Sequence, residues 1–169
     1  VVNASSEEGR LCVNGMSYAK RDGKNANSAI IVTVTPDDFK NKGPLGGMYF
    51  QRELEEKAYA EGGGKIPVQT FKDFENNVKT TELKEVTPCI KGEYTYANLR
   101  NIFPEYISET IIEGMHGFAK KIKDFDREDA VFSGVEARTS SPIRIKRDED
   151  FVSSIKGIYP CGEGAGYAG

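Results

Sequence analysis

The residues best suited to chemistry lie at the C-terminal end of the sequence, in the run IYPCGEGAGYAG at positions 158–169. Its last six residues, Gly164 to Gly169, match the pattern G-x-G-x-x-G, and the residues before them predict a short strand over 157–160. Glycines in this pattern let the backbone approach a phosphate or an aromatic ring closely, and a helix after them would offer free N–H groups to negative charge. The run therefore indicates a nucleotide site or, alternatively, a chance match in a glycine-rich tail.

Two further groups of polar residues are candidates for binding. The first joins two predicted strands, and a guanidinium there, from Arg138 or Arg144, would suit a substrate carboxylate; the alternative is a hairpin turn with surface arginines. The second, near the N-terminal end, fits a polar substrate surface, although asparagine and serine also favour solvated turns. The two groups consist of Arg138, Thr139, Ser140 and Ser141, and of Asn14, Met16, Ser17, Arg21, Asn25 and Asn27.

The run from Lys156 to Gly169 resembles the C-terminal flavin-contacting segment of FAD-dependent oxidoreductases of the two-dinucleotide-binding-domain superfamily. Within that superfamily the sequence is most similar to the bacterial NAD(FAD)-utilising dehydrogenases. It departs from them because it holds no N-terminal strand–GxGxxG–helix of the kind that binds the ADP half of FAD. Further stretches with the same resemblance are SSEEGR at 5–10, NGMS at 14–17, NANS at 25–28, FQRELE at 50–55 and RTSSPIRI at 138–145.

The resemblance implies that the chain is a segment of a longer flavoprotein, called the parent below. The parent would use FAD, with or without NAD(P), to pass a hydride between the flavin and a nicotinamide or an organic substrate. Glu163 would accept a hydrogen bond from a ribitol hydroxyl of FAD, and backbone N–H groups beside it would face the flavin or its phosphates. The cofactor-binding residues implied are Cys161, Gly162, Glu163, Gly164, Ala165, Gly166, Tyr167 and Gly169.

Two lone side chains carry alternatives of their own. Cys161 beside a flavin could shuttle electrons or form an adduct as the thiolate, or it could be a small buried residue at a strand end. His116 could serve as a general base, although most single helical histidines do not. The sequence identifies no catalytic residue and predicts no metal site, because its three cysteines are scattered and it has one histidine.

Composition excludes several classes of function. With 23 Lys and Arg against 26 Asp and Glu, the formal net charge of −3 argues against a nucleic-acid partner. The sequence has no run of about 18 apolar residues, so it predicts no membrane span. Three widely spaced cysteines, without a CxxC pair or a recognisable signal peptide, favour a cytoplasmic protein. The expected partners are a small-molecule substrate and the remaining FAD-binding domain of the parent.

The order of predicted elements indicates an α+β fold with a mixed sheet, one long helix and one or two shorter ones. Helical spacing of apolar residues predicts helices over 48–61 and 104–124, the second with its apolar stripe at Ile107, Ile111, Met115, Phe118 and Ile122. Asn98 is expected to cap a short turn that reaches Phe103. Loops are expected at 18–28 and 37–47, and a loop with a strand at 76–94. Strands are predicted at 11–13, 30–35, 65–71, 130–139, 143–147 and 157–160, with those at 30–35, 130–139 and 143–147 in one sheet covered by the long helix.

We expect residues 1–155 to form an inserted substrate or cap domain, and residues 156–169 to begin the FAD-contacting segment. The isolated segment would then be inactive, and Gly164 to Gly169 would be irregular without the helix that follows them in the parent. The alternative is a non-catalytic α+β domain for protein interaction, with a disordered glycine-rich tail.

Overall fold

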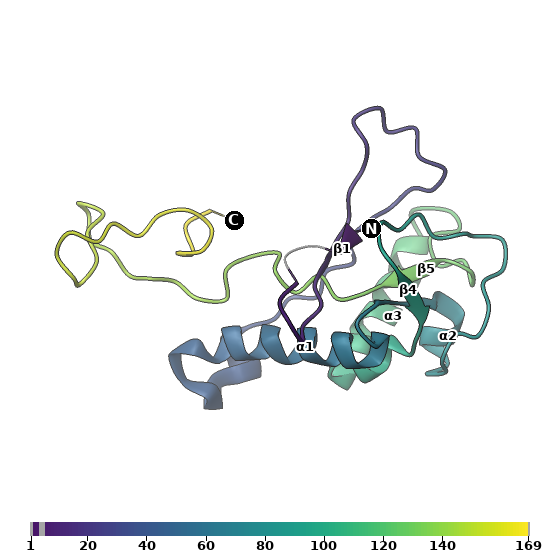
Figure 1. Cartoon of the computed structure of the whole chain (residues 1–169), viewed down its shortest axis with the longest axis horizontal. Helices are drawn as coiled ribbons and strands as arrows, with labels where there is room; N and C mark the ends of the chain where they lie inside the picture. Colours follow the sequence, from purple (N-terminus) through teal and green to yellow (C-terminus); the bar gives the residue numbers. More distant parts are fainter. Residues whose placement is uncertain (1, 4–5, 169) are drawn as a thin grey trace. The chain divides into compact units, whose positions relative to one another are not determined.

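The computed structural model describes residues 2–3 and 6–168 and has the expected α+β class (Figure 1). The chain divides into two compact units. Unit 1 comprises residues 1–33 and 54–136, and unit 2 comprises residues 34–53 and 137–169, so the division falls within a helix. The elements are β1 (Val2–Asn3), β2 (Val13–Asn14), the 3₁₀ helix η1 (Pro36–Leu45), α1 (Gly46–Gly62), β3 (Ile66–Thr70), α2 (Phe71–Glu75), β4 (Tyr94–Tyr96), the 3₁₀ helix η2 (Leu99–Asn101), α3 (Glu105–Ala119) and β5 (Val131–Ser133).

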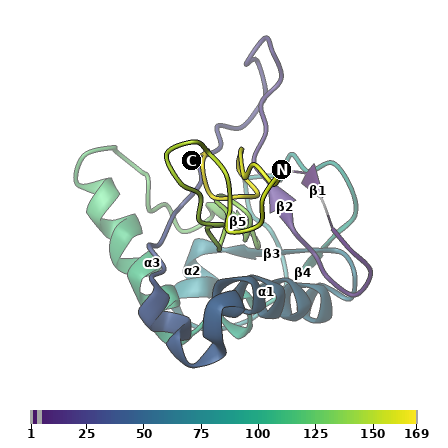
Figure 2. The ribbon, with the colours of Figure 1, turned by 90° about the vertical axis from the view of Figure 1, so that its left-hand side faces the viewer.

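Unit 1 is built on a mixed three-stranded sheet with β3 in the centre. β3 pairs in parallel with β4 and antiparallel with β5, and the three strands lie side by side in Figure 2. Every residue of β3 is buried, which fits its place between two neighbouring strands. A separate two-stranded antiparallel ladder joins β1 to β2. The predicted strand at 65–71 is confirmed.

The core of unit 1 forms where helix residues at helical spacing meet this sheet. α3 buries Ile107, Ile111 and Met115, and α2 buries the rings of Phe71 and Phe74, which both pack near Phe132 of β5. Burial of aromatic and branched side chains is the main stabilising contribution to such a unit. The remaining apolar core residues of this unit include Leu11, Val13, Leu54, Ala58, Ile66, Val68, Leu99 and Ile102.

A buried glutamine joins three segments of unit 1. The side-chain amide of Gln69, in β3, donates to the carbonyl of Val78 at 2.7 Å and to Oδ1 of Asn98 at 3.2 Å. Its oxygen accepts the backbone N–H of Leu99 at 2.8 Å. Asn98 in turn caps η2 by accepting the N–H of Arg100, which confirms the predicted cap. All the polar atoms of Gln69 are thus used where an unpaired group would be costly.

The two longer helices confirm the predicted ones, with one difference in length. α1 ends as expected at its glycines: the N–H of Gly64 bonds to Tyr59 and that of Gly63 to Ala60, a pattern that places Gly63 at a positive φ. α3 stops at Ala119, five residues before the predicted end. The apolar stripe therefore continues beyond the helix, where Ile122 is 54% exposed.

Several predicted strands are wrong. Residues 30–35 form no strand, because this β-branched run pairs with no other described segment, and Ile31 is 69% exposed. Of 130–139 only Val131–Ser133 is a strand, 76–94 contributes only the start of β4, and 11–13 overlaps β2 by one residue. Residues 143–147 and 157–160 are also outside any strand, so the expected sheet of 30–35, 130–139 and 143–147 is wrong.

Unit 2 contains η1 and the first half of α1, followed by a long segment whose described residues, 137–168, are neither helical nor extended into strands. The predicted loop at 37–47 is largely the 3₁₀ helix η1. It begins at Pro36, and the Asp38 carboxylate accepts both the backbone N–H and the hydroxyl of Thr35. The residues from 137 onward are held by turns and by hydrogen bonds between distant segments of the same unit.

Candidate functional site

The glycine-rich tail comprises residues 161–169, and its residues 162–167 fold into a closed turn. The N–H of Tyr167 bonds to the carbonyl of Gly162 at 3.0 Å, and the N–H of Gly166 bonds to that of Glu163 at 2.8 Å. This is the Schellman pattern that also ends α1, and it places Gly166 at φ +82°. The expectation that Gly164 to Gly169 form no helix or strand is confirmed for the described residues 164–168. The hydrogen bonds of the turn nevertheless fix their backbone. Gly169 lies outside the described residues.

Gly166 brings the tail against an earlier segment of unit 2. A Cβ at this position would lie 2.6 Å from the carbonyl oxygen of Ile143 and 3.0 Å from Cα of Arg144. The close approach that glycine permits is therefore made to the chain's own backbone. Gly162 and Gly164 differ, because a Cβ on either would meet nothing within 4 Å. These two glycines leave the backbone accessible from outside.

Hydrogen bonds fix the contact between the tail and residues 141–145. The N–H of Ile145 bonds to the carbonyl of Ala165 at 3.2 Å, and the hydroxyl of Tyr167 donates to the carbonyl of Ile145 at 2.9 Å. The hydroxyl of Ser141 lies 2.8 Å from the carbonyl of Ile143 and 3.2 Å from that of Gly164. Residues 143–147 were predicted to pair with 130–139, and they contact the tail instead.

Helix α1 supports the same segment from within unit 2. Gln51 donates its side-chain amide to the carbonyl of Ser140 at 3.2 Å. Gly47 lies so close to Pro142 that a Cβ would come within 2.7 Å of the proline's carbonyl oxygen. The first half of α1 thus positions the Ser140–Pro142 turn.

Two guanidinium groups make cation–π contacts with the ring of Tyr167. The guanidinium carbon of Arg147 lies 3.7 Å from the ring centroid and that of Arg144 lies 4.4 Å from it. Arg147 also donates to the carbonyl of Pro160 at 2.6 Å. Stacking on an aromatic face fixes the plane of a guanidinium, which long flexible side chains otherwise do not hold. The result is a cluster of positive charge beside the tail.

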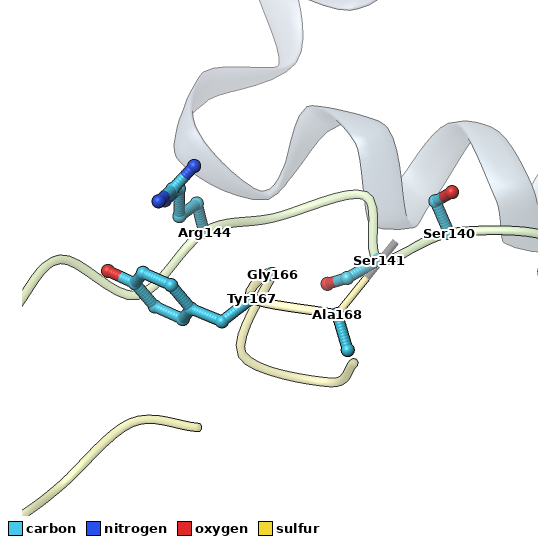
Figure 3. A pocket seen from close by; sticks show the side chains of 6 residues that line it. All are labelled: Ser140, Ser141, Arg144, Gly166, Tyr167 and Ala168. Atoms are coloured by element: carbon cyan, nitrogen blue, oxygen red, sulfur yellow. The ribbon is translucent and has the colours of Figure 1, made fainter. Parts of the chain in front are cut away.

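A pocket of about 260 Å³ opens between these residues (Figure 3). In the figure the side chains of Arg144 and Tyr167 lie at one end and Ser140 lies at the other. Hydroxyl groups, a guanidinium and an aromatic ring together suit a polar or anionic ligand with a flat part. The residues that line the pocket are Ser140, Ser141, Arg144, Gly166, Tyr167 and Ala168.

The pocket brings together part of the predicted site. Ser140, Ser141, Gly166 and Tyr167 line it, whereas Arg138 and Thr139 precede it in the chain without lining it. Cys161, Gly162, Glu163 and Gly164 are exposed and Ala165 is buried, all within unit 2. The alternative of a small buried Cys161 is wrong, because its side chain faces solvent. None of these placements tests binding, so the roles of these residues remain predictions.

The polar group near the N-terminal end belongs to unit 1, and its members are exposed or half-buried. Two of its amides hold the loop itself: Asn27 donates to the carbonyl of Met16 at 2.9 Å, and Asn25 donates to that of Thr87 at 2.7 Å. Arg21 lies at φ +51° in the same loop. Asn14, at the end of β2, and Ser17 are exposed. These contacts favour the structural role of the asparagines, and a role in substrate binding stays a prediction.

His116 is held by two carboxylates of unit 1. Its Nδ1 lies 2.9 Å from Asp126 and its Nε2 lies 2.8 Å from Glu75 of α2. Both ring nitrogens can donate only in the imidazolium form. The hydrogen bonds to Asp126 and then to Glu75 raise the pKa of His116 above its ordinary value of 6.5. A protonated ring with both N–H groups engaged is poorly suited to act as a general base.

Arg147 and Ala168 are the components of this region that the sequence did not single out. Arg147 follows Arg144 by three residues, a spacing that indicates nothing unless the tail returns to the segment between them. Among the described residues, no group of histidine, cysteine or acidic side chains has the arrangement of a metal site. No helix formed by the described residues has the length and apolar character needed to cross a membrane.

Two comparisons with known proteins bear on this arrangement. Residues 1–139 match the family described as "FAD-dependent protein, C-terminal domain-like". The residues that line the pocket and those of the tail lie on the C-terminal side of the matched residues. A protein of Clostridium beijerinckii, described as an uncharacterized protein, is 50% identical over 172 residues, which include 100% of this chain and 32% of the relative. The chain therefore spans about a third of that relative's length.

Proposed function

Because the chain belongs to the family of FAD-dependent proteins with this C-terminal domain-like region, we propose that its parent is a FAD-dependent oxidoreductase. In this proposal unit 1 is part of the substrate domain, and the glycine-rich tail supplies part of the flavin site. The observation that carries it is the accessible backbone at Gly162 and Gly164, which lie on the C-terminal side of the residues that match the family.

The residues of the tail fit a flavin in one specific respect. A ring or a phosphate can approach a backbone only where no side chain intervenes, and Gly162 and Gly164 leave such space on both sides of Glu163. Gly166 does not, because its space is filled by Ile143. The part of the tail suited to the cofactor is therefore residues 161–164, next to the pocket.

Each residue of this surface has a defined part in the proposal. The exposed carboxylate of Glu163 accepts a hydrogen bond from a ribityl hydroxyl, and the backbone of Gly162 and Gly164 lies against the cofactor. The Schellman turn holds Glu163 in place, since its own carbonyl accepts the N–H of Gly166. When bound, FAD supplies the hydride chemistry. A nicotinamide or an organic molecule would be the other party in that transfer.

The test is the flavin content of the parent and of two variants. Glu163→Ala should weaken retention of FAD by about 1–3 kcal/mol, the range for loss of one partner of a charged hydrogen bond. Cys161→Ser is the matched control: it changes an exposed side chain beside Glu163 but keeps the backbone, which makes the contacts expected at this position, so FAD affinity should stay nearly unchanged. Flavin absorbance and a fluorescence titration measure both affinities.

Two results would refute the proposal at different levels. A parent purified without flavin, and unable to take it up, would refute the flavoprotein assignment and favour the non-catalytic interaction domain. A yellow parent in which Glu163→Ala binds FAD as tightly as the unchanged protein would remove Glu163 from the site and leave the flavoprotein assignment intact.

A further inference from the structure

The Arg144 end of the pocket has the character of a site for an oxyanion. We propose that this pocket binds a small organic anion as substrate, with Arg144 holding its carboxylate or phosphate group. The inference names a substrate class for the proposed flavin site, and in that sense it rests on the proposed function.

The donor groups of Arg144 are available for a ligand. Within the part of the chain that the structure describes, its guanidinium makes a contact with the Tyr167 ring and no hydrogen bond or ion pair. A guanidinium carries five N–H donors in a flat fork that matches the two oxygens of a carboxylate or phosphate. The contact with Tyr167, at 4.4 Å, orients that fork beside the pocket before any ligand arrives.

The local charge favours an anion. Arg147 stacks on the same ring at 3.7 Å, and its hydrogen bond goes to a carbonyl rather than to a carboxylate. Two guanidiniums on one ring repel each other, and neither forms a salt bridge among the described residues. The residues that line the pocket include no acidic side chain. A bound oxyanion would offset this concentration of positive charge, in a chain whose formal net charge is −3.

The remaining lining determines the size and polarity of the ligand. The pocket's volume of about 260 Å³ exceeds that of a lone phosphate or acetate and leaves room for a short carbon skeleton. The hydroxyl of Ser140 is at the far side from Arg144, where it can bond a second polar group (Figure 3). The hydroxyl of Ser141 lies within hydrogen-bond distance of the carbonyls of Ile143 and Gly164. A small dicarboxylate or a phosphate ester has this combination of groups.

The first experiment titrates the isotopically labelled 169-residue chain with succinate and, separately, with inorganic phosphate, and follows the backbone amide signals by NMR. We expect saturable shifts at Ser141, Tyr167 and Ala168 with at least one anion. Arg144→Gln should weaken that binding at least about tenfold, because the bidentate contact is lost. Lys146→Gln removes the same charge from an exposed neighbour that does not line the pocket, and it should change the affinity less than about twofold.

The tighter of the two anions identifies the oxyanion that Arg144 prefers. Shifts that never saturate would overturn the proposal. An equal loss of anion affinity in Arg144→Gln and Lys146→Gln would also overturn it, because the binding would then depend only on overall charge. Shifts confined to residues outside the pocket would overturn it as well.

The second experiment separates a substrate anion from the phosphates of FAD, using the parent. If the site serves substrate, Arg144→Gln should leave FAD retention unchanged and should raise KM for an anionic substrate or Kd for the anion found above. If Arg144→Gln weakens FAD binding but not binding of riboflavin, which lacks phosphate, the assignment to substrate is wrong. A flavin-free parent refutes the proposed function, whereas a yellow parent without anion binding at Arg144 refutes this inference alone.

Discussion

Gly166 packs so closely on Ile143 that the absence of a side chain is what allows the tail to fold where it does. A Cβ there would lie 2.6 Å from the Ile143 carbonyl oxygen, and φ is +82°. Both features exclude other residues, one by contact and one by backbone conformation. The second glycine of the motif therefore has a structural function within unit 2, independent of any cofactor.

We predict that Gly166→Ala detaches the tail from residues 143–145. The left-handed backbone alone costs about 1–2 kcal/mol for an L-residue, and the clash adds to it. Hydrogen exchange at the amides of Ile145 and Tyr167 measures the effect. Ile145 loses its acceptor, the carbonyl of Ala165, when the tail detaches, and the bond from Tyr167 to Gly162 within the tail depends on the left-handed backbone of Gly166. Their exchange should become at least about tenfold faster.

Gly164→Ala is the control for this change, since its Cβ would meet nothing within 4 Å. It should leave the exchange of both amides unchanged. Equal protection in Gly166→Ala and in the unchanged protein would show that the contact with Ile143 does not hold the tail.

Among the elements, α3 shows that the helical spacing of apolar residues does not fix where a helix ends. The stripe of apolar residues continues to Ile122, but the helix ends at Ala119 and Ile122 is exposed. Phe118 remains near the helix end, where its ring packs edge-on against Phe125 at 5.2 Å. Periodicity identified the buried face correctly through Met115, and the turn after the helix decided what lies beyond it.

Two alanine substitutions test this boundary. Met115→Ala should lower the free energy of unfolding by about 2–5 kcal/mol, because Met115 is 2% exposed and leaves a cavity. Ile122→Ala should change it by less than about 0.5 kcal/mol, the range for an exposed site. Urea unfolding of the two variants measures both. Similar losses would place Ile122 in the core and contradict the observed helix end.

His116 makes the packing of α2 and of the turn after α3 dependent on pH. Its pKa is raised above 6.5 by Asp126 and Glu75, so the folded state binds the proton more tightly than the unfolded chain does. The resulting stability is fully present below about pH 6.5 and is lost as pH rises through the higher pKa of the folded state.

We predict that His116→Gln lowers Tm by about 1–4 °C at about pH 5.5, and by less at about pH 9, where both proteins lack the charge. The size is small because the three side chains are 33–46% exposed and water screens their attraction. Thermal unfolding across this range gives the measurement. A difference in Tm that does not vary with pH would mean that His116 acts by packing against Phe71 rather than by charge.

For the whole molecule, the central question is which parts of a flavin site reside in these 169 residues. The sequence contains the glycine-rich tail but no strand–GxGxxG–helix of the kind that cradles the ADP half of FAD. A cofactor held by the tail alone would lose the helix N-terminus and the phosphate contacts that supply much of its affinity.

We therefore predict that the 169-residue chain purified by itself carries no stoichiometric FAD, while the parent does. The ratio of flavin absorbance to protein absorbance in each preparation measures this. Addition of FAD to the chain should give no saturable fluorescence quenching at micromolar concentrations. Stoichiometric flavin in the 169-residue chain would contradict the division of the site between this chain and the rest of the parent.

The sequence by itself determined the elements whose signals are local. Helices α1 and α3, the cap at Asn98 and the strand β3 depend on spacing, capping residues and turn glycines within a few positions of one another, and all four are present. The same local motifs supported the resemblance to FAD-dependent proteins, which the family match over residues 1–139 bears out at the level of the family.

Tertiary structure alone decided which segments pair and where the pocket lies. Residues 30–35 have the composition of a strand but pair with no other segment that the structure describes. Residues 143–147 make backbone contact with the tail rather than with residues 130–139. The pocket depends on Tyr167 returning to Arg144 and Arg147, some twenty residues earlier in the chain. A strand or a loop contact forms only with a partner that is distant in the sequence, so its own residues indicate no more than a preference for extended backbone. A helix, by contrast, satisfies its hydrogen bonds within itself.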